Sequence, residues 1–259
     1  MLFFQNIHKT FNKSTDGELK LYNNLNLQID EGEFVSIIGS NGSGKSTLFN
    51  ILCGQIVPDR GEVVFDDVVF NKKKIYERFK EISRVYQDPV AGTSPSLTVL
   101  ENLSLAHDKG KLLNLKKGVH VELIDHFKTL LKTLNLGLEE KLDTKVGQLS
   151  GGQRQALSLL MALMNNPKML LLDEHTAALD PKSSETIMRL TDEMVKKSRI
   201  TTLMVTHNLQ HALDYGDRLI MFHEGDIIFD VKGVDKDRLT RDDLISLFME
   251  HQNFFVEVV

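Results

Sequence analysis

Residues 39–47, which read Gly-Ser-Asn-Gly-Ser-Gly-Lys-Ser-Thr, constrain the fold of this chain more than any other segment. They match the P-loop pattern, in which glycines let the backbone turn so tightly that consecutive N–H groups converge on phosphate oxygens. An apolar, strand-like run at 34–38 precedes the loop, and residues 47–52 continue it in a helical pattern. A chance glycine-rich turn would not need these flanks. The segment therefore predicts an α/β core that binds phosphate.

Each residue of this loop has an expected place around a nucleotide. The helix that follows the loop directs the positive end of its dipole at the phosphate group that the loop binds. Lys45 would place its ammonium on the β and γ phosphates, and Ser46 would give its hydroxyl to Mg²⁺, a hard cation that prefers oxygen ligands. The residues expected to bind nucleotide here are Gly39, Ser40, Asn41, Gly42, Ser43, Gly44, Lys45, Ser46 and Thr47.

A second constraint is the apolar run at 169–172, which ends in two acids, Asp173 and Glu174. A buried parallel strand delivers such acids to the carboxyl edge of a sheet, where the ligands of α/β folds bind. Asp173 can then hold Mg²⁺ directly or through water, and Glu174 can polarise an attacking water. The alternative, a surface turn after a buried strand, is remote in a chain that also carries a P-loop.

The apolar patterns divide the rest of the chain into a sheet core and a helical insert. Residues 1–88 alternate β-rich runs with polar turns, and 165–240 alternate strands with helices. Between them, 89–164 carries apolar residues at helical spacing. The predicted fold is α/β, a P-loop core with a mixed sheet and an inserted α-helical subdomain, in a single domain over 1–250. A C-terminal helix and an apolar tail are expected over 241–259.

Composition excludes some partners. The 31 basic and 36 acidic residues give a formal charge of −5, which provides no broad basic field for nucleic acid. Cys53 is the only cysteine, so no internal disulfide can form. We expect no signal peptide, and no run of about 18 apolar residues occurs. If the protein works at a membrane, another chain must hold it there.

Residues 149–153 read Leu-Ser-Gly-Gly-Gln and are the most specific signal in the chain. With the P-loop and the acids Asp173 and Glu174 in this order, they resemble the signature of the ATP-binding cassette (ABC) family, and the resemblance extends from about residue 2 to 229. A P-loop kinase or GTPase would have no use for this motif, and no Asn-Lys-x-Asp guanine reader is present. The resemblance implies ATP and Mg²⁺ as ligands, an N-terminal antiparallel β subdomain and a RecA-like core.

Other residues stand where the family has functional groups. Gln87 matches the glutamine loop that joins the sheet core to the helical insert, and His207 resembles the switch histidine that senses the γ phosphate. Phe11 resembles the aromatic residue that stacks on adenine, with Tyr22 as a rival. Asp180 matches the loop that crosses to a partner subunit. The implied catalytic residues are Glu174, His207 and Gln87, and the implied Mg²⁺ ligands are Ser46, Gln87 and Asp173.

The Leu-Ser-Gly-Gly-Gln motif also implies a dimer. Ser150 opens a helix, so its hydroxyl and the first N–H groups form an anion site, although a plain cap and turn would have the same sequence. In the family this site reaches the γ phosphate bound by the opposite subunit, so two chains sandwich two nucleotides. The residues implied in that contact are Ser150, Gly151, Gly152 and Gln153.

The implied function is an ATPase subunit that powers solute transport across the cytoplasmic membrane by ATP-driven dimer closure. Uptake is favoured, because stand-alone cassettes of this length resemble prokaryotic importers. The implied partners are a second copy, integral-membrane permease subunits and an extracytoplasmic substrate-binding protein, which would place the chain at the cytoplasmic face of the membrane as a peripheral protein. The alternative is a single-cassette ATPase of a cytosolic assembly system.

One residue departs from the family's commonest pattern. His175 follows the catalytic acid where many members have proline, which would fix the backbone there. We favour a subfamily variant without a chemical role. The sequence Asp-Glu-His-Thr is similar to that of cassettes from bacterial uptake systems for amino acids or phosphonates, and it does not identify the cargo.

Overall fold

The computed structural model describes residues 1–111 and 118–251 and divides the chain into two compact units. The first unit comprises Met1–Ile75 and Leu203–Val259, and the second comprises Tyr76–Thr202. The predicted helical insert at 89–164 lies within the second unit, and its expected boundaries stay a prediction. The predicted apolar tail lies outside the described residues.

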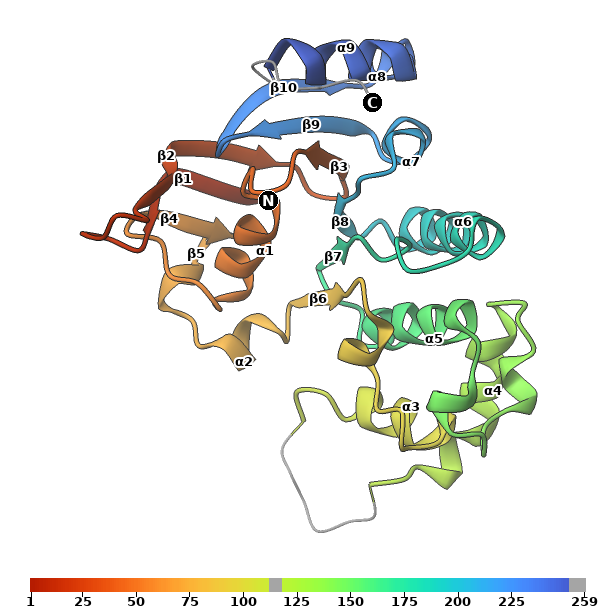
Figure 1. Ribbon diagram of the computed structural model, residues 1–259. Coiled ribbons are helices and arrows are strands. Elements are labelled where there is room, and N and C mark those ends of the chain that lie inside the picture. The colour runs from red at the N-terminus through yellow and green to blue at the C-terminus, as the bar shows by residue number, and fades with distance from the viewer. Residues whose placement is uncertain (112–117, 252–259) are drawn as a thin grey trace. The chain divides into compact units, whose positions relative to one another are not determined.

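The first unit contains a four-stranded antiparallel sheet, in agreement with the implied β subdomain (Figure 1). Its strands, in spatial order, are β2 (Leu19–Ile29), β1 (Leu2–Phe11), β4 (Arg60–Phe65) and β5 (Val68–Val69). Over residues 25–29 of β2, apolar residues at alternate positions are buried while the residues between them are exposed, as period-two patterning requires of a half-buried strand.

A mixed sheet in the same unit carries the phosphate loop. Strand β3 (Phe34–Gly39) pairs in parallel with β9 (Arg218–His223), which pairs antiparallel with β10 (Asp226–Lys232). Strand β8 (Thr201–Val205) is the other neighbour of β3. Every residue of β3 is buried, which explains why it reads as a continuous apolar run. Helix α1 (Lys45–Cys53) follows the loop and ends at Gly54, whose φ of 81° suits a left-handed helix cap.

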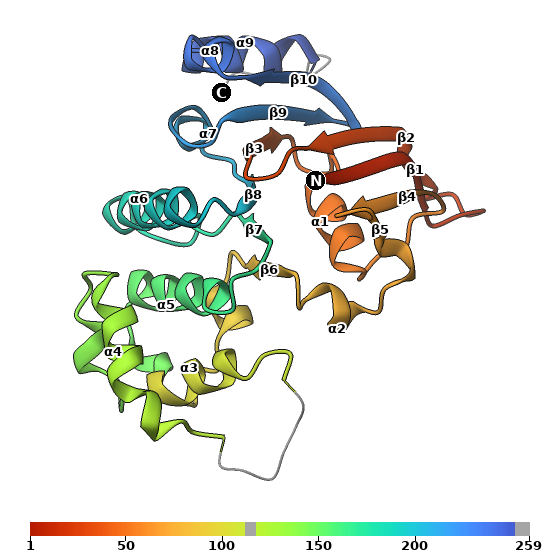
Figure 2. The ribbon, with the colours of Figure 1, turned by 180° about the vertical axis from the view of Figure 1, so that it is seen from behind.

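Short helices cover β9 and β10. They are α7 (Leu209–Asp214), α8 (Val234–Asp237) and α9 (Arg241–His251), and both views show α8 and α9 beside β10 (Figures 1 and 2). Leu244 of α9 is fully buried against Met221 of β9 and Ala212 of α7. This contact explains why the predicted C-terminal helix is part of the first unit.

The second unit combines a strand pair with a helical layer. Strands β6 (Ile82–Val85) and β7 (Met169–Asp173) run parallel, with Val85 opposite Leu172. The helices are α2 (Ile75–Arg78), which begins at the unit boundary, α3 (Val99–His107), α4 (Ile124–Lys132), α5 (Gly151–Leu163) and α6 (Pro181–Ser198).

One apolar core joins α3 to α6 in this unit. Its fully buried members include Leu103, Phe127, Leu157 and Ile187, one from each of these four helices. A 3₁₀ turn at Val121–Leu123 precedes α4, so the α-helix itself begins at Ile124. No side chain caps that turn, so its backbone tightens instead.

Candidate nucleotide-binding site

The P-loop lies between β3 and α1 and depends on glycine. Gly39, Gly42 and Gly44 all have positive φ, at 151°, 80° and 108°. A Cβ on Gly39 would lie 2.3 Å from the carbonyl oxygen of Phe222 on β9, so a larger residue would push the loop off the sheet. These angles and this close approach are consistent with the tight glycine turn that the P-loop pattern predicts.

The ammonium of Lys45 binds the backbone of the loop itself. Its Nζ donates to the carbonyl oxygens of Gly39 and Ser40, at 2.8 Å each, and lies 3.4 Å from the hydroxyl of Ser43. The residue is only 5% exposed. A buried cation is thus held by the backbone of the loop, and a buried cation of this kind is suited to a charge-assisted hydrogen bond with an anion such as phosphate. Ser46 follows on the first turn of α1 and is exposed.

Tyr22 supports the loop from beneath. Its hydroxyl donates to the carbonyl of Gly44 at 2.6 Å, the side chain is 2% exposed, and burial raises its pKa. A ring packed in this way cannot also stack on a base in solvent. Phe11, the other candidate for the adenine contact, is partly exposed at the end of β1, with the ammonium of Lys9 5.3 Å from its ring centre.

His207 lies at the same edge of the sheet as the P-loop. The N–H of Thr206, directly after β8, donates to the carbonyl of Ile37 on β3 at 3.1 Å, so the ends of these two strands are side by side. Asn208 then caps α7 by accepting from the N–H groups of Gln210 and His211. His207 is exposed between these two fixed positions.

In the second unit, Asp173 ends β7 and Glu174 follows it. Glu174 has a φ of 48°, a left-handed conformation that is uncommon outside glycine, and its carbonyl accepts from the N–H of Ala177. The carboxylate of Asp173 pairs with the guanidinium of Arg84 on the neighbouring strand β6. Sequence reasoning missed Arg84. The only available signal was an arginine in a short strand that also contains Ile82 and Val85.

His175 is buried and hydrogen-bonded. Its Nε2 lies 3.3 Å from the hydroxyl of Thr191 in α6, and both residues are 2% exposed or less. Because the Thr191 hydroxyl donates to the carbonyl of Ile187, its oxygen is the acceptor and Nε2 is the donor. The histidine therefore ties the turn after Glu174 to the middle of α6, a structural role that the sequence did not indicate.

The predicted signature helix begins as expected. Ser150 caps α5 by accepting from the N–H of Gln153, whose side chain accepts in return from the N–H of Ser150, at 3.2 Å each. Gln153 also donates to the carbonyl of Leu136. Ser150 and Gly151 are exposed, so the hydroxyl and the first N–H groups of α5 face solvent at the positive end of the helix.

Gln87 and Asp180 occupy exposed turns of the same unit. Gln87 follows β6, and since β6 and β7 are parallel neighbours, it lies at the sheet edge where Asp173 also ends. Asp180 caps α6 by accepting from the N–H of Ser183 at 3.1 Å, and hydrogen bonds from Ser183 hold the pKa of Asp180 below its usual value. Each unit thus gathers part of the predicted set of residues.

These features define a class: a P-loop cassette in which a capped signature helix accompanies the phosphate loop and a strand that ends in two acids. The sequence agrees, because residues 22–177 match the family model described as ABC transporter. The chain belongs to this family. It is the ATP-binding subunit of an import system and hydrolyses ATP to drive transport.

Relatives extend over nearly the whole chain. A tyrosine transport ATP-binding protein of Clostridioides difficile is 51% identical over 248 residues, which cover 96% of this chain and 98% of that protein. Among solved structures, an ATP-binding cassette of an ABC transporter in its ADP conformation has a TM-score of 0.78 at 29% identity, covering 96% of this chain and 98% of its own. A dimeric cassette in a post-hydrolysis state, bound to ADP and Pi, has a TM-score of 0.75 at 35% identity. The match covers 90% of this chain and 98% of that chain.

Proposed function

We propose that two copies of this chain bind MgATP between them, close around it, and drive amino-acid import through separate membrane subunits. The observation that carries this proposal is the buried ammonium of Lys45 inside the P-loop, held by the loop's own carbonyls. An ATP phosphate would exchange with those carbonyls as the partner of the ammonium, and the exchange gains a charge-assisted hydrogen bond. Phe11 would contact the adenine.

The donor set fits a magnesium ion. The hydroxyl of Ser46, the carboxylate of Asp173 and the amide oxygen of Gln87 are all hard oxygen donors of the kind that Mg²⁺ prefers. When bound with ATP, Mg²⁺ would neutralise charge on the phosphate oxygens. These three residues are the proposed ligands, and each is at least partly exposed where it stands.

Hydrolysis would use Glu174, the acid that directly follows β7. Glu174 would accept a proton from the water that attacks the γ phosphorus, while His207 and Gln87 would orient that water and the γ phosphate. The left-handed φ of Glu174 supports this role, because strained backbone of this kind is costly and recurs at catalytic sites.

Closure of the dimer would complete the site. The exposed hydroxyl of Ser150 and the N–H groups of Gly151 and Gly152 are suited to the γ phosphate bound by the second copy. ATP can drive closure only if it binds the closed state more tightly than the open one, and these contacts would supply the difference. Gln153 holds this helix start in place, and the loop at Asp180 would lie near the partner. The dimeric relative supports this arrangement.

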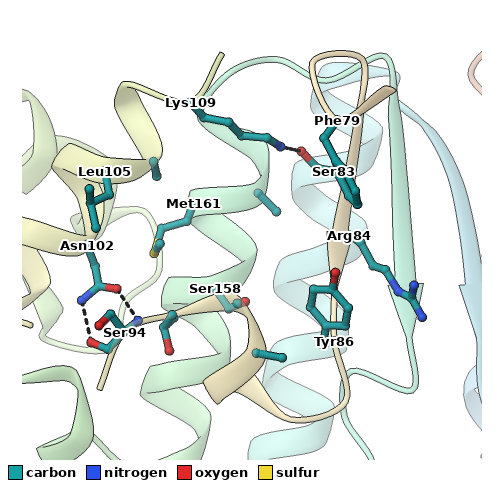
Figure 3. Close-up of a pocket in the computed structure, with 15 residues that line it drawn as sticks. Phe79, Ser83, Arg84, Tyr86, Ser94, Asn102, Leu105, Lys109, Ser158 and Met161 are labelled. Atoms are coloured by element: carbon teal, nitrogen blue, oxygen red, sulfur yellow. Dashed lines mark hydrogen bonds between the residues drawn. The ribbon is translucent and has the colours of Figure 1, made fainter. Parts of the chain in front are cut away.

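A cavity of about 440 Å³ in the second unit offers a docking place for the membrane subunits (Figure 3). Its lining includes Leu105, Met161 and Ser83, and the hydroxyl of Ser83 accepts from Lys109 at 3.0 Å. Asn102 is 1% exposed and holds the backbone of Ser94 through two hydrogen bonds. The cavity is partly apolar, and its lining is close in sequence to Gln87, the residue through which nucleotide state would reach the partner.

The cargo proposal rests on the tyrosine transport relative. At 51% identity over nearly the full length, a related amino acid is the favoured cargo, and an extracytoplasmic binding protein would deliver it. No helix among residues 1–111 and 118–251 is long and apolar enough to cross a membrane. We propose that the chain works at the cytoplasmic face, held there by the permease subunits.

The test compares two matched substitutions of exposed apolar residues. Leu105→Glu places a charge in the cavity, whereas Val57→Glu places one on an exposed turn of the first unit; the parent residues are 55% and 67% exposed. Tagged variants are purified from detergent-solubilised membranes. We expect Leu105→Glu to lose the integral-membrane subunits with ATP affinity unchanged, and Val57→Glu to keep them. If the Leu105→Glu variant still retained the integral-membrane subunits, the cavity would be excluded as their docking place.

A set of partners that is entirely soluble would instead favour the cytosolic assembly system. For the cargo, the complex is reconstituted in vesicles and ATP-dependent accumulation of labelled tyrosine is measured. Uptake that depends on ATP and on Lys45 supports the proposal. A complex that hydrolyses ATP but accumulates another solute in preference to tyrosine would refute the proposed cargo. The proposal that the chain belongs to an importer would still stand.

A further inference from the structure

Arg84 is a cation inside a strand that is otherwise buried. The three other residues of β6, Ile82, Ser83 and Val85, are all buried, and the side chain of Arg84 is 6% exposed. A guanidinium removed from water to this degree is costly unless it has a partner of opposite charge. The strand therefore keeps an arginine at this position for a contact rather than for packing.

The contact is with the proposed Mg²⁺ ligand Asp173. One terminal nitrogen of the guanidinium pairs with Oδ2 of Asp173, whose side chain is 16% exposed. The register sets this geometry: Arg84 is opposite Leu171, and Asp173 lies two residues further along β7. The guanidinium also lies over the ring of Tyr86, at 4.9 Å from its centre, which limits its freedom to move away.

The side chains on the two faces of β6 make different contacts. Ser83 faces Lys109, and the guanidinium of Arg84 extends away from Lys109 (Figure 3). Successive residues of a strand point to opposite sides, so Arg84 and Tyr86 share a face. Lys109 is a second cation in the lining of the cavity, where it donates to the hydroxyl of Ser83, and it provides a matched control.

We propose that Arg84 is a positioning residue that holds Asp173 as an internal counter-ion and thereby lowers the affinity of the site for Mg²⁺ with and without nucleotide, so that the ion binds only where nucleotide phosphates add negative charge. The proposal rests on the proposed role of Asp173 as a metal ligand. Without nucleotide, Oδ2 is occupied and the carboxylate charge is balanced, so a free divalent cation meets a neutral pair. Phosphates add the negative charge that the ion needs, and the metal enters with them.

The direction of the effect follows from charge alone. A fixed positive charge beside Asp173 repels a divalent cation that shares the same carboxylate, and partial burial weakens the screening by salt. Removing the guanidinium should therefore tighten Mg²⁺ binding. A purely structural role predicts the reverse, because loss of a packed side chain would loosen the site.

The experiment measures how much Mg²⁺ tightens the binding of a non-hydrolysable ATP analogue. Its Kd is determined by calorimetry in excess EDTA and in saturating Mg²⁺, and the ratio of the two values reports the coupling. We expect this ratio to rise about three- to tenfold in Arg84→Met relative to the unmodified chain. It should rise less in Arg84→Lys, which keeps the charge. Lys109→Met, with the same loss of charge, should leave it unchanged.

Two further measurements keep the test decisive. If Arg84→Met folds poorly, Arg84→Gln replaces it, and the rise in melting temperature caused by Mg²⁺ with the analogue gives a second readout. Asp173→Asn should reduce the ratio, and Arg84→Met should add nothing in that background. If Asp173→Asn leaves the ratio unchanged, the proposed metal ligand is wrong. If Asp173→Asn reduces it while Arg84→Met does not raise it, only the inference about Arg84 is overturned.

Discussion

The buried ammonium of Lys45 leads to a quantitative prediction for Lys45→Met. The methionine keeps much of the apolar stem that packs in the loop and removes the positive charge together with its hydrogen bonds to Gly39 and Ser40. Because the residue is 5% exposed, water cannot replace the ammonium at the same point. Nucleotide affinity should fall, and the glycine backbone of the loop should keep its shape.

The structure bounds the size of this effect. At an effective dielectric constant of about 20, opposite unit charges about 4 Å apart attract by about 4 kcal/mol. The ammonium gives up its bonds to two loop carbonyls when it turns to phosphate, so only part of that energy becomes affinity. We expect a loss of about 2–3 kcal/mol, or roughly 30- to 150-fold in Kd.

Calorimetric titration with ATP at fixed salt measures this change. Lys72→Met, which removes an exposed lysine from the same unit, is the control for net charge and should bind as the unmodified chain does. Thermal denaturation confirms that both variants are folded. A folded Lys45→Met protein with a Kd within about threefold of the original would refute the phosphate role of Lys45, since that corresponds to under about 0.7 kcal/mol.

Three smaller predictions concern individual side-chain contacts, two beside the site and one near the end of α3. Tyr22→Phe removes the 2.6 Å hydrogen bond to Gly44 and should cost about 1 kcal/mol in urea denaturation; an unchanged midpoint would mean that packing alone places the loop. His175→Leu leaves Thr191 without its donor and should cost about 1–3 kcal/mol by the same assay, and full stability would contradict the proposed tie to α6. Bonds to Glu122 and Asp108 raise the pKa of His120, so its stabilising contribution should be complete below about pH 6.5 and disappear as pH rises through the folded value. His120→Gln should therefore differ from the unmodified chain at acidic pH and match it at alkaline pH, and a difference independent of pH would contradict this.

The features that the sequence predicted well are local. The P-loop, the strand that ends in Asp173 and the capped start of α5 each lie within a few consecutive residues, and each has a pattern that backbone geometry enforces. The helices of the insert are confirmed for the same reason, and the antiparallel β subdomain that the family resemblance implied is confirmed as well. Their periodicity follows directly from which side faces the core.

The features that the sequence missed are distant contacts. Arg84 and Asp173 are 89 residues apart and meet only because β6 and β7 are parallel neighbours in one particular register. His175 meets Thr191 across the turn into α6, and no local pattern encodes that distance. The sequence left open whether Phe11 or Tyr22 contacts adenine. The burial of Tyr22 beneath Gly44 argues against Tyr22.

The central claim, that this chain forms half of a hydrolytic site completed by a second copy, is tested most directly with Glu174→Gln. The amide keeps the size of the side chain and cannot accept the proton of the attacking water, so ATP turnover should fall by about 10²- to 10⁴-fold with ATP affinity retained. Light scattering with MgATP should then show a stable dimer that disperses with ADP. Glu62→Gln, an exposed acid on β4, should change neither quantity. Undiminished turnover, or a strictly monomeric Glu174→Gln protein in saturating MgATP, would contradict the account.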